Sequence, residues 1–212
     1  GTVLTETGLQ PTEAEVEAAL TGFLGEQEQL PPLYSAIKVD GKKLYEYARA
    51  GITIEREARP ITISEIIIEE IHLPRITMHV SCSKGTYIRT LCNDIGEKLG
   101  CGGCMESLLR TRVGAFNLSQ AVTLTELEKL RDEDRLSEVL LTVEDAFPDS
   151  EKVRTLPSGD KPCHNGNPLR NADLSVKPKT ETIRLYDSEG NFIGLYERNE
   201  KYHNWKPLKM FI

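Results

Sequence analysis

One short segment combines residue types that can bind an anionic or polar ligand. Ser83–Thr90 (SKGTYIRT) lies where a strand-like alternation of apolar residues changes to a helical period. Such a junction presents free backbone N–H groups and the positive end of a helix dipole. Gly85 allows a tight turn, and Thr86 is the expected N-cap of the helix. The alternative is a capped turn on which Tyr87 and Arg89 are ordinary surface residues, and the residues alone favour neither interpretation.

A second segment interleaves basic and aromatic residues. Between positions 34 and 49 these residues are Tyr34, Lys38, Lys42, Lys43, Tyr45, Tyr47 and Arg49. Basic side chains can bind phosphates while tyrosine rings stack on unpaired bases, so the segment is a candidate contact for nucleic acid. The alternative is a solvated helix over Lys42–Ala50, closed by Gly51, whose tyrosines pack by their rings. Composition alone favours this alternative.

The cysteines predict no metal site. Cys101-Gly102-Gly103-Cys104 has CxxC spacing, but zinc needs four ligands, and no second pair of cysteine or histidine residues lies at a usable distance in the sequence. We therefore expect a turn between two helices at these glycines, with no metal and no redox function. The five cysteines are an odd number in a chain without a secretion signal, which favours reduced thiols in a cytoplasmic protein.

The formal net charge of −7 does not exclude RNA, because the charges are unevenly placed. Residues 1–30 contain no basic residue and residues 124–151 are rich in Asp and Glu, whereas basic residues gather between Lys38 and Arg112. A basic centre between acidic flanks can still bind phosphates. No apolar run approaches the roughly 18 residues of a membrane span, so no membrane association is expected.

Periodicity and local signals predict an α+β fold: a mixed, mostly antiparallel sheet flanked by helices. The expected helices follow the capping boxes Thr12–Glu15 and Thr123–Glu126, cover Ile88–Leu99, and run through Leu108–Leu109. The expected strands are Pro60–His72, buried on both faces, and residues 76–82, 113–118, 183–187 and 192–197, the last two forming a hairpin.

Two domains are expected, residues 1–148 and a small β-rich domain over residues 149–212. The boundary is placed at the start of Pro148–Pro162, where turn formers and charge replace periodicity. Gly1 is interpreted as a tag remnant or a truncated boundary, because the first residues read neither as a signal peptide nor as a natural start.

Three stretches together resemble, in order, signatures of the bacterial TruB-type tRNA pseudouridine synthases. They are Leu30–Gly51 (LPPLYSAIKVDGKKLYEYARAG), Ser83–Thr90 continued by Asp94–Gly102 (DIGEKLGCG), and Leu108–Gly114 (LLRTRVG). The likeness runs from about residue 10 to residue 147, and the C-terminal part, with Asn165-Gly166-Asn167-Pro168, is loosely similar to the family's PUA-like tail.

The resemblance implies an isomerase that converts a T-loop uridine of tRNA to pseudouridine with no metal or cofactor, after the base has been flipped into a pocket. It implies that Tyr87 lines this pocket, that Leu108 packs beneath the base, and that Arg89 pairs with the catalytic aspartate. An arginine keeps a nucleophilic carboxylate ionised and oriented. Lys42 and Lys43 are the implied phosphate contacts.

The other candidate RNA contacts are Tyr34, Lys38 and Lys84. The expected partner is the T-arm stem-loop of tRNA. No protein partner is implied, and we expect a monomer.

One part of the family pattern is missing from the chain. The nucleophile of the family lies in a Gly- and Asp-containing loop before the region matched by Leu30–Gly51, and no such loop is present. Asp40, Asp94 and Asp145 lack its motif context, so the role is assigned to none of them. We therefore expect that the chain begins inside the catalytic domain and is inactive alone. The alternative is a non-catalytic RNA-binding or tRNA-folding module that lacks the nucleophile naturally.

Overall fold

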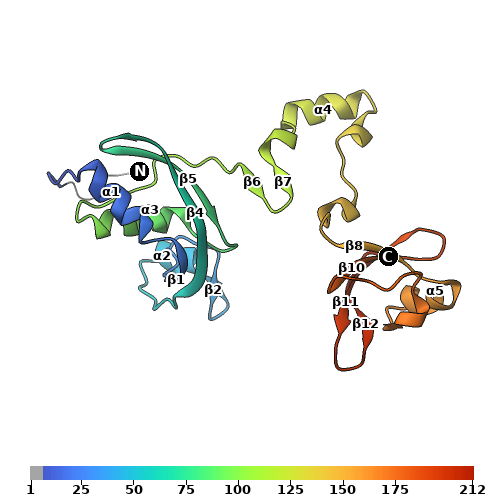
Figure 1. Cartoon of the computed structure of the whole chain (residues 1–212). Coiled ribbons are helices and arrows are strands. Elements are labelled where there is room, and N and C mark those ends of the chain that lie inside the picture. The colour runs from blue at the N-terminus through green and yellow to red at the C-terminus, as the bar shows by residue number, and fades with distance from the viewer. Residues whose placement is uncertain (1–6) are drawn as a thin grey trace. The chain divides into compact units, whose positions relative to one another are not determined.

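The computed structural model describes residues 7–212 and divides the chain into two compact units, Gly1–Leu108 and Leu109–Ile212. Figure 1 shows that both units mix helices and strands, which confirms the expected α+β class. The boundary expected between residues 148 and 149 falls inside the second unit and stays a prediction.

The first unit is built on a three-stranded antiparallel sheet. Its strands are β1 (Gly25–Gln29), β4 (Arg59–His72) and β5 (Arg75–Cys82), in the order β1-β4-β5. Helices α1 (Glu13–Thr21) and α3 (Ile88–Lys98) pack on this sheet. The buried core between them consists of Val16, Leu20, Ile61, Ile63, Leu91 and Ile95. α1 begins at the expected capping box of Thr12 and Glu15.

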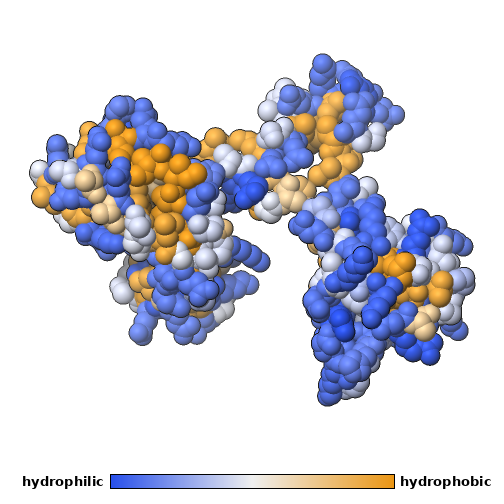
Figure 2. All heavy atoms as spheres, in the orientation of Figure 1, coloured by the Kyte–Doolittle hydropathy of each residue, from blue (hydrophilic) through white to orange (hydrophobic). Residues whose placement is uncertain are grey.

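Strand β4 is buried on one face only, so the expectation of burial on both faces was wrong. Ile61 and Ile63 are buried, whereas Ile67, on the other face, is 49% exposed. The isoleucine-rich sequence suggested burial on both faces because β4 has two register shifts against β5. They lie between Ile63 and Glu65 and between Ile68 and Glu70. Each bulge changes which residues face inward and breaks the period of two that a half-buried strand otherwise shows. Figure 2 shows apolar residues gathered in a band on the visible face of the first unit.

The segment predicted as one helix over Lys42–Ala50 is a hairpin followed by a shorter helix. β2 (Lys38–Val39) pairs with β3 (Lys42–Lys43), and α2 (Leu44–Arg49) begins only after the hairpin. Asp40 and Gly41 form the connecting turn with φ values of 51° and 80°. An Asp-Gly pair is favoured in a two-residue hairpin loop because both positions need positive φ. Lys42 and Lys43 therefore lie in a strand and not in the helix.

The helix predicted through Leu108–Leu109 is absent. Residues 102–111 have no regular secondary structure, and the chain next forms the hairpin of β6 (Arg112–Val113) and β7 (Phe116–Asn117). The stretch between Gly103 and this hairpin is about two helical turns long, and so short a helix is marginal without tertiary packing. Leu109 has little such packing, because its side chain is 71% exposed.

The second unit contains α4 and a five-stranded sheet. Its first part holds η1 (Leu118–Gln120), α4 (Leu124–Asp132), η2 (Leu136–Glu138) and η3 (Val143–Ala146). The sheet has the order β8-β10-β11-β12-β9, with β8 (Glu151–Arg154), β9 (Leu169–Arg170), β10 (Thr182–Tyr186), β11 (Phe192–Asn199) and β12 (Asn204–Met210). α5 (Pro157–His164) and η4 (Asn171–Asp173) complete it. The expected capping box of α4 and the β10–β11 hairpin are confirmed.

Gly96 makes a close contact that positions α3, and its replacement by alanine is expected to destabilise the first unit. A Cβ atom at Gly96 would overlap backbone atoms of Gly102 and Gly103, which cannot rotate away as a side chain can. Overpacking of this kind costs about 1–3 kcal/mol. Chemical denaturation of Gly96→Ala should show this loss, whereas Gly8→Ala, where a Cβ meets nothing within 4 Å, should leave stability nearly unchanged. Equal stability of both variants would contradict the packing.

Candidate active site

The turn between β5 and α3 is fixed to the sheet by Ser83. The backbone N–H of Ser83 donates to the carbonyl oxygen of Thr62 at 2.8 Å, and the N–H of Thr62 donates to Ser83 Oγ at 2.9 Å. Gly85 has φ of 92°, a conformation that favours glycine. The first turn of α3 therefore starts from a defined point at the end of β5, and exposed Lys84 lies on this turn.

Tyr87 is the N-cap of α3, so the prediction that Thr86 is the cap was wrong. Tyr87 has the extended backbone of an N-cap, with φ of −98° and ψ of 104°. The Thr86 hydroxyl instead lies 3.4 Å from Ser83 Oγ, inside the turn. A residue that sequence reasoning missed binds the cap: the Gln29 side chain contacts the Tyr87 backbone through both of its polar atoms. No local signal marks Gln29, because it precedes Tyr87 by 58 residues.

Arg89 lies on the first turn of α3 and contacts the segment that carries Tyr34. Its guanidinium donates to the carbonyl oxygen of Tyr34 over 3.0 Å. Tyr34 and Arg89 are 55 positions apart in the sequence. The contact places Tyr34, a predicted RNA contact, beside Arg89, the predicted partner of the nucleophile. Within residues 7–212 the structure shows no ion pair for Arg89, and its pairing with a nucleophilic aspartate stays a prediction.

The three aspartates considered in the sequence have other surroundings. Asp40 lies in the β2–β3 turn. Burial raises the pKa of Asp94, whose carboxylate accepts a hydrogen bond from Asn93. Asp145 accepts hydrogen bonds from the Thr142 hydroxyl and backbone, which lower its pKa. Among the described hydrogen bonds and ion pairs, none of the three contacts Arg89.

Leu108 lies in the stretch of residues 102–111 that has no regular secondary structure, and its side chain is 52% exposed. It does not belong to the buried cluster formed by α1, α3 and β4. The apolar floor assigned to Leu108 by resemblance is therefore not part of the core, and its convergence with Tyr87 and Arg89 stays a prediction.

The predicted phosphate contacts lie together on the β2–β3 hairpin. Lys38 is directly opposite Lys43, and Lys42 is opposite Val39. Lys38 and Lys42 are exposed, while Lys43 Nζ lies 5.4 Å from the centre of the Tyr45 ring and 3.4 Å from its hydroxyl. Directly opposed like charges disfavour the hairpin, so an anion bound between them would relieve a repulsion. Lys42 lies on the opposite face of the hairpin from Lys38 and Lys43, and the phosphate-binding role of these lysines stays a prediction.

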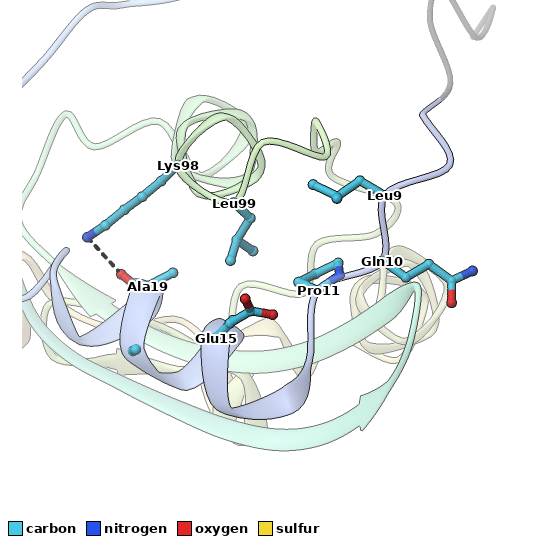
Figure 3. A pocket seen from close by; sticks show the side chains of 8 residues that line it. Leu9, Gln10, Pro11, Glu15, Ala19, Lys98 and Leu99 are labelled. Carbon is cyan, nitrogen blue, oxygen red and sulfur yellow. Dashed lines mark hydrogen bonds between the residues drawn. The ribbon is translucent and has the colours of Figure 1, made fainter.

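A hollow of about 420 Å³ lies elsewhere on the first unit. Its lining consists of Leu9, Gln10, Pro11, Glu15, Ala18, Ala19, Lys98 and Leu99. Figure 3 shows Lys98 reaching from α3 to the carbonyl oxygen of Ala19, a distance of 3.2 Å. The Glu15 carboxylate is used by the capping box with Thr12. Both charged groups have structural partners, so we interpret this hollow as a seam between two helices.

The cysteines show no arrangement typical of a metal site in the part of the chain that the structure describes. No group of three or more His, Cys, Asp or Glu residues there could hold a metal ion. Cys101 Sγ donates to the carbonyl oxygen of Gly102 at 3.3 Å, and Cys104 is exposed. Burial raises the pKa of Cys92, and the electrostatic interaction with neighbouring Cys104 raises it further. Among the described helices, none is both long and apolar enough to cross a membrane.

Sequence comparison identifies the family. Residues 1–88 match the N-terminal domain of the TruB family pseudouridylate synthases, and residues 89–148 match the tRNA pseudouridylate synthase B C-terminal domain. A relative from Alkaliphilus oremlandii is 39% identical over an alignment of 213 residues that covers 99% of this chain and 70% of the relative. The chain belongs to the TruB family. A relative from Lachnoclostridium phytofermentans is 44% identical over an alignment of 205 residues that covers 90% of this chain and 66% of the relative. Both relatives are named tRNA pseudouridine synthase B.

Solved structures show the same fold at lower identity. A chain of a Cbf5-Nop10-Gar1 complex aligns with a TM-score of 0.72 and 22% identity, covering 98% of this TruB-family chain and 64% of that chain. A chain of an H/ACA RNP bound to a substrate RNA containing 2'-deoxyuridine aligns with a TM-score of 0.70 and 19% identity, covering 98% and 63%. This chain spans about two thirds of the length of the curated relatives that it matches.

Proposed function

We propose that this chain is the part of a tRNA pseudouridine synthase that shapes the pocket for the target uridine, uridine-55 of the T loop. The observation that carries the proposal is the first turn of α3, where Tyr87 and Arg89 lie two residues apart at a point anchored to the sheet. Arg89 contacts the Tyr34 segment there and uses only part of its hydrogen-bonding capacity within the described residues. Membership of the TruB family supports pseudouridine formation as the reaction. The geometry of the first turn of α3 supports the roles proposed for Tyr87 and Arg89.

The reaction is an isomerisation that needs no oxidant and no added group. The bond between uracil nitrogen and the ribose carbon breaks, and a bond from a uracil carbon to the same ribose carbon forms. The ring carbon loses its proton, and the ring nitrogen gains one. In this proposal Tyr87 offers a flat aromatic wall to the flipped base, and Leu108 offers an apolar contact beneath it. Arg89 donates to a nucleophilic aspartate and keeps that carboxylate ionised.

The proposed partner is the T-arm stem-loop of tRNA. Lys38, Lys42 and Lys43 on the hairpin, Lys84 on the turn before α3, and Tyr34 beside Arg89 are the proposed RNA contacts. Phosphate contacts of this kind fix the register of the RNA, and the pocket selects the base. Action as a monomer, without a protein partner and in the cytoplasm, stays a prediction.

The 212-residue chain by itself should bind a T-arm stem-loop but form no pseudouridine. Loss of a covalent nucleophile leaves only the binding contribution to catalysis. Release of tritium from RNA labelled at the uridine carbon that loses its proton measures turnover directly. The control is the full-length gene product at the same concentration.

Three outcomes are decisive for the proposed function. Turnover by the 212-residue chain would reveal a nucleophile among its own residues. A full-length protein that binds tRNA without turnover would instead support the alternative of a non-catalytic RNA-binding or tRNA-folding module. Turnover only by the full-length protein would support the proposal.

A further inference from the structure

The start of α3 differs from the starts of α1 and α4. In α1 and α4 a threonine N-cap and a glutamate three residues later satisfy each other's backbone N–H groups, so each cap is local. In α3 the N-cap Tyr87 makes no side-chain cap hydrogen bond. The residue three positions later is Thr90, whose short side chain has no such contact with Tyr87 in the structure.

Gln29 supplies from another element the contact with the N-cap backbone N–H that the glutamate makes in α1 and α4. Its side-chain oxygen accepts from the Tyr87 N–H at 2.8 Å, and its side-chain nitrogen donates to the Tyr87 carbonyl oxygen at 3.1 Å. A primary amide presents an N–H donor and a carbonyl acceptor side by side in one plane, so it can bind the N–H and C=O of a single residue. The Gln29 side chain is 4% exposed, which shields both hydrogen bonds from water.

The position of Gln29 connects this cap to the sheet and to the Arg89 contact. Gln29 is the last residue of β1 and lies opposite Arg59 of β4 in the register. The chain then continues to Tyr34, whose carbonyl oxygen binds Arg89. The short segment from Gln29 to Tyr34 is thus attached at both ends to the first turn of α3.

We propose that Gln29 is a positioning residue that fixes Tyr87 for the reaction by holding its backbone against the end of β1. This inference rests on the proposed function and adds a residue that does not itself touch the base. The hydrogen bonds hold the backbone of Tyr87, and with it the direction in which its Cα–Cβ bond leaves the turn.

Two substitutions separate the hydrogen bonds from the space that Gln29 fills. Gln29→Met keeps a side chain of similar length without amide groups, so both contacts with Tyr87 are lost. Gln29→Glu keeps the acceptor for the Tyr87 N–H but sets a carboxylate oxygen against the Tyr87 carbonyl oxygen. Gln27→Met is a matched control, because Gln27 lies on the same strand and its side chain contacts Phe23 instead.

Hydrogen exchange in the 212-residue chain tests the cap without any need for activity. In Gln29→Met the amide of Tyr87 should exchange at least about tenfold faster, because it loses its only described acceptor. The amide of Leu91 donates to the Tyr87 carbonyl oxygen and belongs to the first turn, whereas the amides of Ile95 and Leu99 report on the body of α3 and should keep their protection. Unchanged exchange at Tyr87 would overturn the proposal. Loss of protection along the whole helix would also overturn it, since Gln29 would then hold the fold and not the first turn.

A double-mutant cycle in the full-length protein tests the link to catalysis. Gln29→Met should lower the single-turnover rate about ten- to a hundredfold, the scale expected when a reacting group is misplaced by about 1 Å. The dissociation constant for tRNA should stay within about twofold, because no RNA contact is removed. In a Tyr87→Ala background the same change should cost several-fold less, because the ring that Gln29 positions is gone.

The outcomes of the cycle separate this inference from the proposed function. Equal, additive effects of Gln29→Met in the two backgrounds would overturn the positioning role while leaving the function standing. An unmodified full-length protein that forms no pseudouridine would instead overturn the function itself. Recovery of most of the rate by Gln29→Glu would assign positioning to the Tyr87 N–H contact alone, which supports the inference.

Discussion

Replacing Arg89 by alanine in the full-length protein is expected to lower the single-turnover rate about a hundred- to a thousandfold, the usual effect of removing one charge-stabilising donor from an active site. The affinity for tRNA should change by no more than about twofold. The reason is that Arg89 is assigned to the nucleophile, so its loss misorients one carboxylate and leaves the RNA contacts of the hairpin in place. An effect on the chemical step alone appears in the rate and not in the dissociation constant.

Two further variants test this assignment. Arg89→Lys keeps the positive charge but loses the planar fork of donors, so it should recover little of the rate. Arg75→Ala removes another arginine of the first unit, one that pairs with Glu106 at 3.0 Å, and should leave the rate unchanged. If Arg89→Ala keeps a normal rate, its pairing with the aspartate is wrong. If its rate and affinity fall together, Arg89 is an RNA contact.

Replacing Lys42 and Lys43 together by alanine should have the opposite effect. Binding of the T-arm stem-loop should weaken about tenfold near physiological salt, and the slope of log affinity against log salt should become shallower by about 1 to 2, because two phosphate contacts are lost. The rate at saturating tRNA should stay within about twofold, since neither lysine is assigned to the reacting base. Titrations at two salt concentrations, combined with single-turnover rates, measure both quantities.

The control for this prediction is the double variant Lys42→Arg and Lys43→Arg, which retains both charges and should retain the salt slope. Alanine at position 43 leaves the backbone hydrogen bond from Lys43 to Glu46 in place, so the start of α2 should persist. Unchanged affinity and an unchanged slope in the alanine variant would show that the two lysines are solvated surface charges.

The sequence predicted the elements whose signals are local. The capping boxes at Thr12 and Thr123 start helices as expected, because both partners of each box lie within one turn. The β10–β11 hairpin followed from two apolar strands around a Gly-containing turn. Assigning Tyr87 and Arg89 to one turn needed only the change from strand to helix spacing, and the structure confirms that change at Ile88.

The errors occurred where tertiary structure overrides local signals. The bulges in β4 disturb an alternation that otherwise reports one-sided burial. Within Pro148–Pro162, where the sequence shows no periodicity, the structure contains β8 and most of α5. α5 has poor helix formers, but Pro157 suits its first turn, and Gly159 lies so close to Asp173 that a side chain would not fit. Gln29 could not be found from local spacing, because its partner lies 58 residues away.

The remote cap of α3 also bears on the order in which the chain folds. α1 and α4 can begin to form as soon as their own residues are available, whereas the first turn of α3 is complete only after a loop of 58 residues has closed and β1 has joined β4. Closing such a loop costs conformational entropy before the contacts between its ends can stabilise it. The turn that carries Tyr87 and Arg89 should therefore become structured after the folding transition state, so that substitutions at Gln29 speed unfolding more than they slow folding.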